Sequence, residues 1–89
     1  MKKKLTKGKT VRRRMMFDIV ETQIQENEPP ETKQTLNRLL KEGYSREEAM
    51  ELIAIVVASE IYDVMKHQQP FNRNRFVKRL EDLPDLPED

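Results

Sequence analysis

Cysteine is absent from this sequence of 89 residues, and His67 is its only histidine. Without cysteine the chain can form neither a disulfide framework nor a thiolate metal site, and one histidine excludes a histidine-rich zinc site within a single chain. With only two glycines, the chain also lacks the glycine-rich loops that bind phosphates or dinucleotides. These absences exclude the common nucleotide enzymes, and we expect no cofactor and no small-molecule substrate.

Long apolar segments are missing as well. The longest one, residues 52–58, has seven residues, whereas a helix that spans a bilayer needs about 20. The charged N-terminus is not followed by the apolar segment of a secretory signal peptide. We therefore expect a soluble, cytoplasmic protein without a membrane span.

Positive charge is concentrated at the N-terminus. Residues 1–14 contain eight lysines and arginines and no acidic residue, whereas the net charge of the chain is only +1, so residues 15–89 carry a charge of −7. We expect residues 1–10 to form a flexible basic arm, because ordering them would concentrate like charges while burying little surface. Such an arm binds the phosphates of nucleic acid without sequence preference, or it serves only as a solubilising leader. The candidate polyanion-binding residues are Lys2, Lys3, Lys4, Lys7, Lys9, Arg12, Arg13 and Arg14.

Apolar residues at three- and four-residue steps predict a first helix from about Val11 to Gln25. This helix should stop near Asn27, because Pro29 and Pro30 lack amide donors and disfavour helical backbone before them. Pro30 then fits the first position of a second helix, where an amide hydrogen is not needed.

The second helix should bury Leu36, Leu39 and Leu40. Gly43 follows it at the place of a left-handed C-terminal cap. Two residues later, Ser45 and Glu48 have the spacing of a capping box, which predicts the start of a third helix.

The third helix should extend to about Gln68. Its middle, residues 52–58, has no polar side, so we expect other helices to surround it. Pro70 follows its end, and Phe71 and Phe76 flank Asn72 as the two halves of a hydrophobic staple around an N-cap. This arrangement predicts a fourth helix. Its inward residues should be Phe76, Val77 and Leu80.

These patterns predict an all-α fold, a small four-helix domain over residues 11–83 with a central apolar helix. Residues 84–89, rich in proline and acid, should form an acidic flexible tail. A foldable part of roughly 70 residues is near the lower size at which a core alone suffices. We therefore expect a homodimer that buries part of the first or third helix.

The strongest candidate for metal binding or catalysis lies on the third helix. Glu60, Asp63 and His67 have helical spacing that places them on one face, with Glu60 inside the apolar stripe. Two carboxylates and an imidazole would suit a divalent metal. In the alternative interpretation, Glu60 binds an arginine or a backbone amide at a helix junction, and His67 only favours the helix C-terminus.

A second basic cluster lies on the fourth helix. It consists of Arg73, Arg75, Lys78 and Arg79. These cations could extend a polyanion footprint, or they could neutralise Glu81, Asp82 and the acidic faces of other helices.

Several short motifs are spread over the body of the chain. They are Gln23-Ile24, Pro29-Pro30-Glu31, Arg38-Leu39-Leu40-Lys41-Glu42-Gly43, Glu48-Ala49, and the segment from Ile61-Tyr62-Asp63 to Pro70-Phe71. With these motifs, residues from about Phe17 to Leu83 resemble a bacterial family of uncharacterised small helical proteins, a domain of unknown function.

The resemblance implies a metal site. In that family, histidines commonly occupy the positions of Glu47 and Glu51, and sometimes positions near Arg13 and Phe17. Here Glu47 and Glu51, one helical turn apart, would offer oxygen ligands in place of the histidines.

The working hypothesis is a non-enzymatic interaction module that associates with itself and contacts a polyanion through its basic arm. No Ser/His/Asp or Cys/His arrangement supports an enzyme. The alternative is a metal-binding or catalytic helical domain that uses Glu60, Asp63 and His67.

Overall fold

The structure of the chain is a computed structural model that describes residues 7–87, with side chains from Arg13 onward. Within this range the chain forms four helices and no strand, so the predicted all-α fold is confirmed. The helices are α1 (Lys7–Glu26), α2 (Pro30–Lys41), α3 (Arg46–His67) and α4 (Arg73–Asp82).

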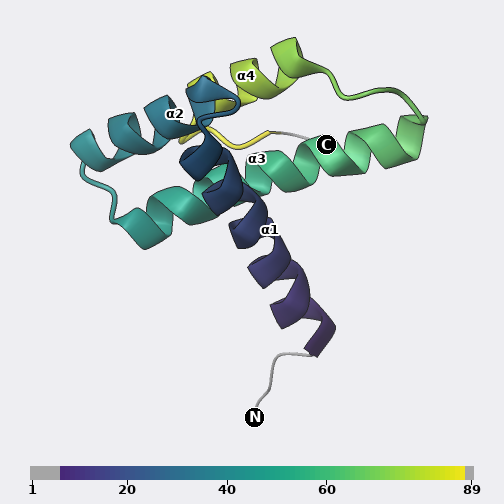
Figure 1. The fold of residues 1–89 in the computed structure, drawn as a ribbon, viewed down its shortest axis with the longest axis horizontal. Coiled ribbons are helices and arrows are strands. Elements are labelled where there is room, and N and C mark those ends of the chain that lie inside the picture. The colour runs from purple at the N-terminus through teal and green to yellow at the C-terminus, as the bar shows by residue number, and fades with distance from the viewer. Residues whose placement is uncertain (1–6, 88–89) are drawn as a thin grey trace.

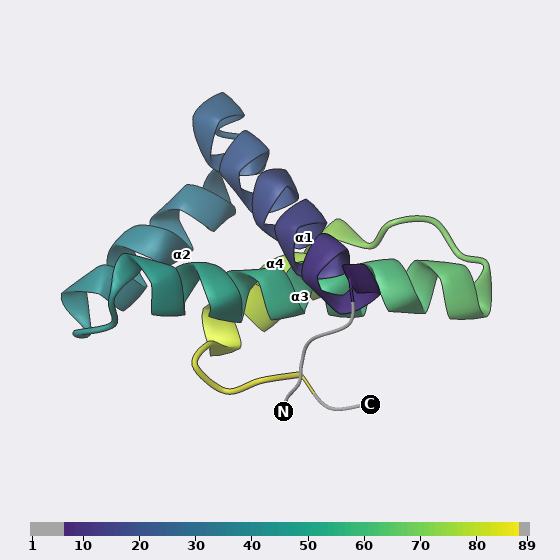
Figure 2. The same ribbon diagram turned by 90° about the horizontal axis from the view of Figure 1, so that it is seen from below.

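Helix α3 is the centre of the domain, because it is the longest helix and contributes more buried residues than any other. Helices α2 and α4 follow its length on one side, whereas α1 crosses it obliquely (Figures 1 and 2). The first turns of α1 extend past α3, away from α2 and α4 (Figure 1). The core between these elements includes Val20 from α1, Leu39 from α2, Ile53 and Val56 from α3, and Leu80 from α4.

Helix α1 begins at Lys7, earlier than the predicted Val11. Residues 7–10 of the predicted flexible arm are therefore helical, and residues 1–6 lie outside the described part of the chain. At its other end α1 stops as predicted, at Asn27, which has a φ of 54°. The amides of Asn27 and Glu28 donate back to the carbonyls of Ile24 and Gln23, at 3.2 and 3.0 Å, in a Schellman motif.

Helix α2 starts at Pro30, as predicted, and ends in a second Schellman motif. Gly43 has a φ of 105°, and the amide of Tyr44 donates to the carbonyl of Leu39 at 3.1 Å. The prediction that Leu40 is buried is wrong, because 39% of this residue is exposed. The inward face of the helix instead starts with two threonines. It consists of Thr32, Thr35, Leu36 and Leu39.

Helix α3 begins at the predicted capping box. The Glu48 amide donates to the Ser45 hydroxyl at 3.0 Å, and the Ser45 amide donates to the Glu48 carboxylate at 2.9 Å. The prediction of burial on all sides is wrong, because Ile55 is 41% exposed and Ala58 is exposed too. The oblique path of α1 explains this difference, since a crossing helix covers only a short length of its neighbour.

Helix α4 begins at Asn72, whose side-chain oxygen accepts a hydrogen bond from the Arg75 amide at 2.9 Å. The predicted staple is present, with the rings of Phe71 and Phe76 5.7 Å apart. Phe76 and Leu80 are buried, whereas Val77 is half-buried. Leu83 follows the helix and is also buried. None of the helices in the described residues has the length and apolar character needed to cross a membrane.

Candidate functional site

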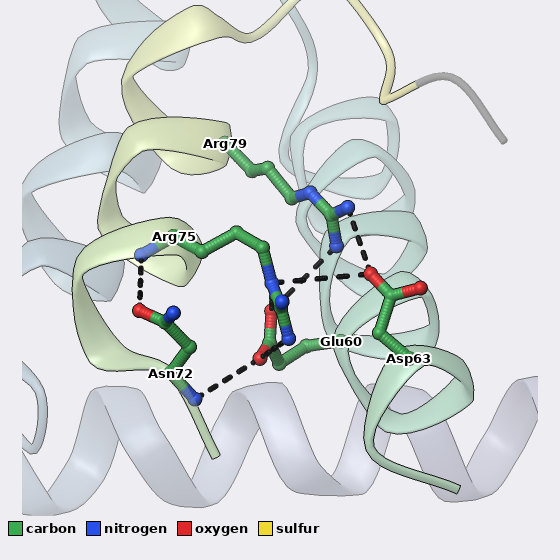
Figure 3. Close-up of polar contacts among 5 residues, drawn as sticks. All are labelled: Glu60, Asp63, Asn72, Arg75 and Arg79. Carbon is green, nitrogen blue, oxygen red and sulfur yellow. Dashed lines mark hydrogen bonds and ion pairs between the residues drawn. The ribbon is translucent and has the colours of Figure 1, made fainter. Parts of the chain in front are cut away.

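Glu60 is the buried acid of the structure, with 3% of the residue exposed. Its carboxylate lies between α3 and α4 and accepts hydrogen bonds from Arg75, from Nη2 at 2.6 Å and from Nε at 3.1 Å (Figure 3). The backbone amide of Asn72 donates to the same carboxylate at 3.2 Å. Glu60 thus joins the middle of α3 to both the N-cap and the first turn of α4.

Asp63 lies one turn further along α3 and faces the next arginine of α4. Nη2 of Arg79 is 2.8 Å from its carboxylate, and Nε of Arg75 is 3.9 Å from it. The hydrogen bond from Arg79 holds the pKa of Asp63 below its ordinary value, with partial desolvation opposing the effect. The hydrogen bond to Glu60 likewise raises the pKa of Arg75.

These four side chains form one alternating network, which we call the α3–α4 charge cluster: Glu60, Asp63, Arg75 and Arg79. Nη1 of Arg79 lies 3.6 Å from Glu60 and, among the described residues, forms no hydrogen bond. Two carboxylates and two guanidinium groups balance in charge. The network therefore has the chemistry of a structural ion-pair cluster.

His67 does not join this network and lies exposed at the end of α3. In residues 7–87, no three side chains of the types that bind metal ions are grouped so that they could hold one. Arginines contact the carboxylates of both Glu60 and Asp63. The interpretation of Glu60 as the partner of an arginine and a backbone amide at a helix junction is confirmed.

The basic residues of α4 are also paired with acids. Arg73 binds Glu31 of α2 at 3.0 Å and lies 4.0 Å from Glu28, while Lys78 lies 3.4 Å from Asp82. Arg75 and Arg79 belong to the α3–α4 charge cluster. The second basic cluster of the sequence thus neutralises acidic helix faces, as one of the two interpretations predicted.

The predicted polyanion-binding residues lie in and before α1. Lys2, Lys3 and Lys4 precede the described residues, and Lys7, Lys9 and Arg12 lie on the first turns of the helix. Arg13 forms an ion pair with Glu51 of α3 and stacks over the ring of Phe17, 5.1 Å from its centre. Arg14 is exposed.

The structure brings together the four positions that the family resemblance implied. Arg13 and Phe17 of α1 lie against Glu51 of α3, and Glu47 is 3.8 Å from the Arg13 guanidinium. A cation of the chain itself therefore occupies the space between the two carboxylates. One guanidinium against two carboxylates halves the negative charge that would attract a metal ion to Glu47 and Glu51.

Beside this pair, α1 and α3 enclose a small apolar hollow. Its volume is about 270 Å³, and its apolar lining consists of Met16, Phe17, Ala54, Ile55 and Ala58. Sequence reasoning missed this feature because it placed residues 52–58 inside the core. The exposed positions could have been found only from the angle at which α1 crosses α3.

No model of a protein family, no curated protein and no solved structure matches this chain. The resemblance to a bacterial family of small helical proteins stays a prediction.

Proposed function

We propose that the protein is a non-enzymatic interaction module whose basic N-terminal segment, residues 1–14, contacts polyanions such as RNA or DNA without sequence preference. The observation that carries this proposal is the separation of charge between this segment and residues 15–89, which we call the body. The segment has eight cations and no acid, whereas residues 15–89 have a charge of −7. A dense group of cations attracts phosphates and releases their counterions.

Ion pairing within the body sharpens this separation. The body has nine lysines and arginines, and six of them lie within 4.0 Å of a carboxylate. The six are Arg38, Arg46, Arg73, Arg75, Lys78 and Arg79. Because these six cations are already neutralised, the body has three further lysines to attract an external polyanion. The N-terminal segment has seven cations besides Arg13, which is paired with Glu51.

The start of α1 adds to this attraction. The first turn of the helix contains no acidic residue, although its free amides make this end of any helix electropositive. Lysine and arginine side chains next to this positive helix end add to its positive potential. A bound anion would neutralise both the side-chain charges and the helix dipole. Anion binding should therefore stabilise the first turns of α1.

The non-enzymatic part of the proposal is supported by the α3–α4 charge cluster. Its acids are held by two arginines, and no nucleophile is paired with a base there. We further propose, from composition and from the resemblance, that the module acts in the bacterial cytoplasm.

The test is fluorescence anisotropy of a labelled oligouridine of 20 nucleotides with the full chain over a range of salt concentrations. We expect the logarithm of the affinity to fall linearly with the logarithm of salt, by about 0.7 for each phosphate neutralised. A double-stranded DNA of unrelated sequence should bind with a similar salt dependence.

Two variants with equal loss of charge locate the contact. Replacement of Lys2, Lys3 and Lys4 by glutamine should weaken binding and reduce the salt slope. The matched variant Lys33→Gln, Lys41→Gln, Lys78→Gln, which changes exposed lysines of the body, should bind like the unmodified chain. Equal losses in both variants would place the contact on the body, and absence of binding at low salt would leave the segment as a solubilising leader.

A further inference from the structure

Helix α3 has an apolar stripe that no other helix of the domain covers. It consists of Ile55, Ala58, Tyr62 and Met65, which follow each other at steps of three and four residues and so share one face. Tyr62 is 56% exposed and Met65 is 73% exposed. The C-terminal half of α3 extends beyond the crossing with α1 (Figure 1).

The stripe continues into the apolar hollow between α1 and α3. Ile55 and Ala58 belong to both features. A hollow of about 270 Å³ has room for one large side chain. The face therefore combines projecting side chains, Tyr62 and Met65, with a cavity of suitable size and polarity for one of them.

The charges at the two ends of the stripe have opposite signs. Glu47 and Glu51 lie before it, with 77% and 45% of their side chains exposed, and keep one net negative charge after pairing with Arg13; Lys66 and His67 lie after it. A second α3 in the antiparallel direction places the basic end of one copy beside the acidic end of the other. Antiparallel helix dipoles also attract each other, so this direction is favoured over the parallel one.

We propose that a second copy of this chain docks on the stripe, with the two α3 helices antiparallel about a two-fold axis. The axis passes between Ala58 and Ser59, whose small side chains allow close approach of the helices. In this register Ile55 of one copy faces Tyr62 of the other, Glu51 faces Lys66, and Met65 enters the apolar hollow. The inference goes beyond the proposed function and does not depend on polyanion binding.

The first test is the molar mass of the full chain, measured by size-exclusion chromatography with light scattering over a range of concentrations. We expect a dimer mass for the unmodified chain and a monomer mass for Ile55→Asp. The matched control is Leu40→Asp on α2, because Leu40 and Ile55 are almost equally exposed, at 39% and 41%. Leu40→Asp should remain dimeric, and far-ultraviolet circular dichroism should show both variants folded.

The second test uses the absence of cysteine from the chain. In Ala58→Cys the two introduced thiols lie beside the two-fold axis, at a distance that a disulfide can bridge, so mild oxidation should yield a covalent dimer. Asn37→Cys, at an exposed position of α2, should stay monomeric on a denaturing gel.

Three results would overturn the proposal: a monomer mass at every concentration, a dimer that persists in Ile55→Asp, or equal cross-linking at positions 58 and 37. Binding of the oligouridine by Ile55→Asp separates the two proposals. A monomeric variant that still binds RNA shows that the face and the basic segment act independently. If the unmodified chain is a dimer but does not bind the oligouridine, the proposed function is refuted and the dimer proposal is not.

Discussion

Glu60 is the residue on which the junction between α3 and α4 depends. Its buried carboxylate accepts hydrogen bonds from Nε and Nη2 of Arg75 and from the amide of Asn72. It also forms an ion pair with Arg79. The Glu60→Gln variant keeps the size of the side chain but leaves Arg75 without its main counter-charge and Arg79 with Asp63 alone. Breaking a buried ion pair in this way costs about 3–5 kcal/mol.

We expect a smaller loss for Glu60→Gln, about 2–3 kcal/mol of unfolding free energy, because the Arg75 and Arg79 side chains keep 30% and 20% of their surface in water. Urea denaturation followed by circular dichroism measures this value. Glu81→Gln on the exposed side of α4 is the control and should change the stability by less than about 0.5 kcal/mol. Equal stability of the two variants would contradict the role given to Glu60.

Asp63 makes the unfolding free energy of the domain depend on pH in the acidic range. Its pKa is lower in the folded chain, through the hydrogen bond from Arg79, than in the unfolded chain. As the pH falls, Asp63 therefore binds a proton in the unfolded state before it does so in the folded state. The stabilisation that Asp63 gives the fold is complete above about pH 4 and is lost as the pH falls through the folded pKa.

The unmodified chain should accordingly lose unfolding free energy below about pH 4, and Asp63→Asn should lose less over the same interval. Urea denaturation at a series of pH values between about 5 and 2 gives both profiles. Parallel profiles for the two proteins would show that Asp63 does not contribute to this dependence.

The sequence predicts the environment of Glu60 but not its partners. Helical angles place Glu60 between apolar positions of α3, and burial of a carboxylate requires a cation or a donor nearby. Several arginines of the fourth helix could supply the cation. Only the packing of α4 along α3 decides that Arg75 and Arg79, rather than Arg73, face these acids.

At the scale of the helix, α3 has adjacent residues with opposite environments. Val56 is fully buried, and Ile55 beside it is 41% exposed. An unpaired carboxylate in the core costs several kcal/mol, comparable with the whole stability of a domain of this size. We therefore expect Val56→Asp to abolish cooperative thermal unfolding, while Ile55→Asp melts as a folded protein.

Differential scanning calorimetry of the two variants checks this prediction. A normal melting transition for Val56→Asp would contradict the central position of α3. Loss of the transition in Ile55→Asp would show instead that the exposed stripe is needed for folding of the single chain.

The helix boundaries that rest on local chemistry are predicted well. The Ser45–Glu48 capping box, the Asn72 cap and the left-handed Gly43 each involve neighbouring residues only, so no tertiary information is needed. The exposure of Leu40 and Ile55 is mispredicted for the opposite reason. Apolar periodicity shows which residues can be buried, but the crossing of helices decides which of them are.

The start of α1 involves two opposing effects. Like charges favour disorder, whereas lysine, arginine and methionine are good helix formers and continue a helix that is already fixed at Val20. Apolar periodicity predicts a start at about Val11, and charge density predicts that the residues before it are flexible. In the structure the helix continues back to Lys7.

At the scale of the whole molecule, the polar contacts between elements remote in sequence stabilise one arrangement of the four helices. Arg38 of α2 donates to the backbone carbonyl of Leu80 in α4 at 3.1 Å, and Arg46 at the start of α3 binds Glu21 of α1 at 3.0 Å. The sequence pattern predicts three helices around α3 but contains no information on these pairings. They depend on which helix ends meet in space.

The uninterrupted course of α1 from Val20 to Lys7 has a mechanical consequence. At a rise of about 1.5 Å per residue, this stretch sets the first turns of the helix roughly 20 Å from the core contact at Val20. A helical spacer of this kind is stiff, whereas a coil of the same length samples many distances and directions. If the N-terminal segment binds nucleic acid as proposed, this stiff helix would fix the distance and orientation of the body relative to the bound strand.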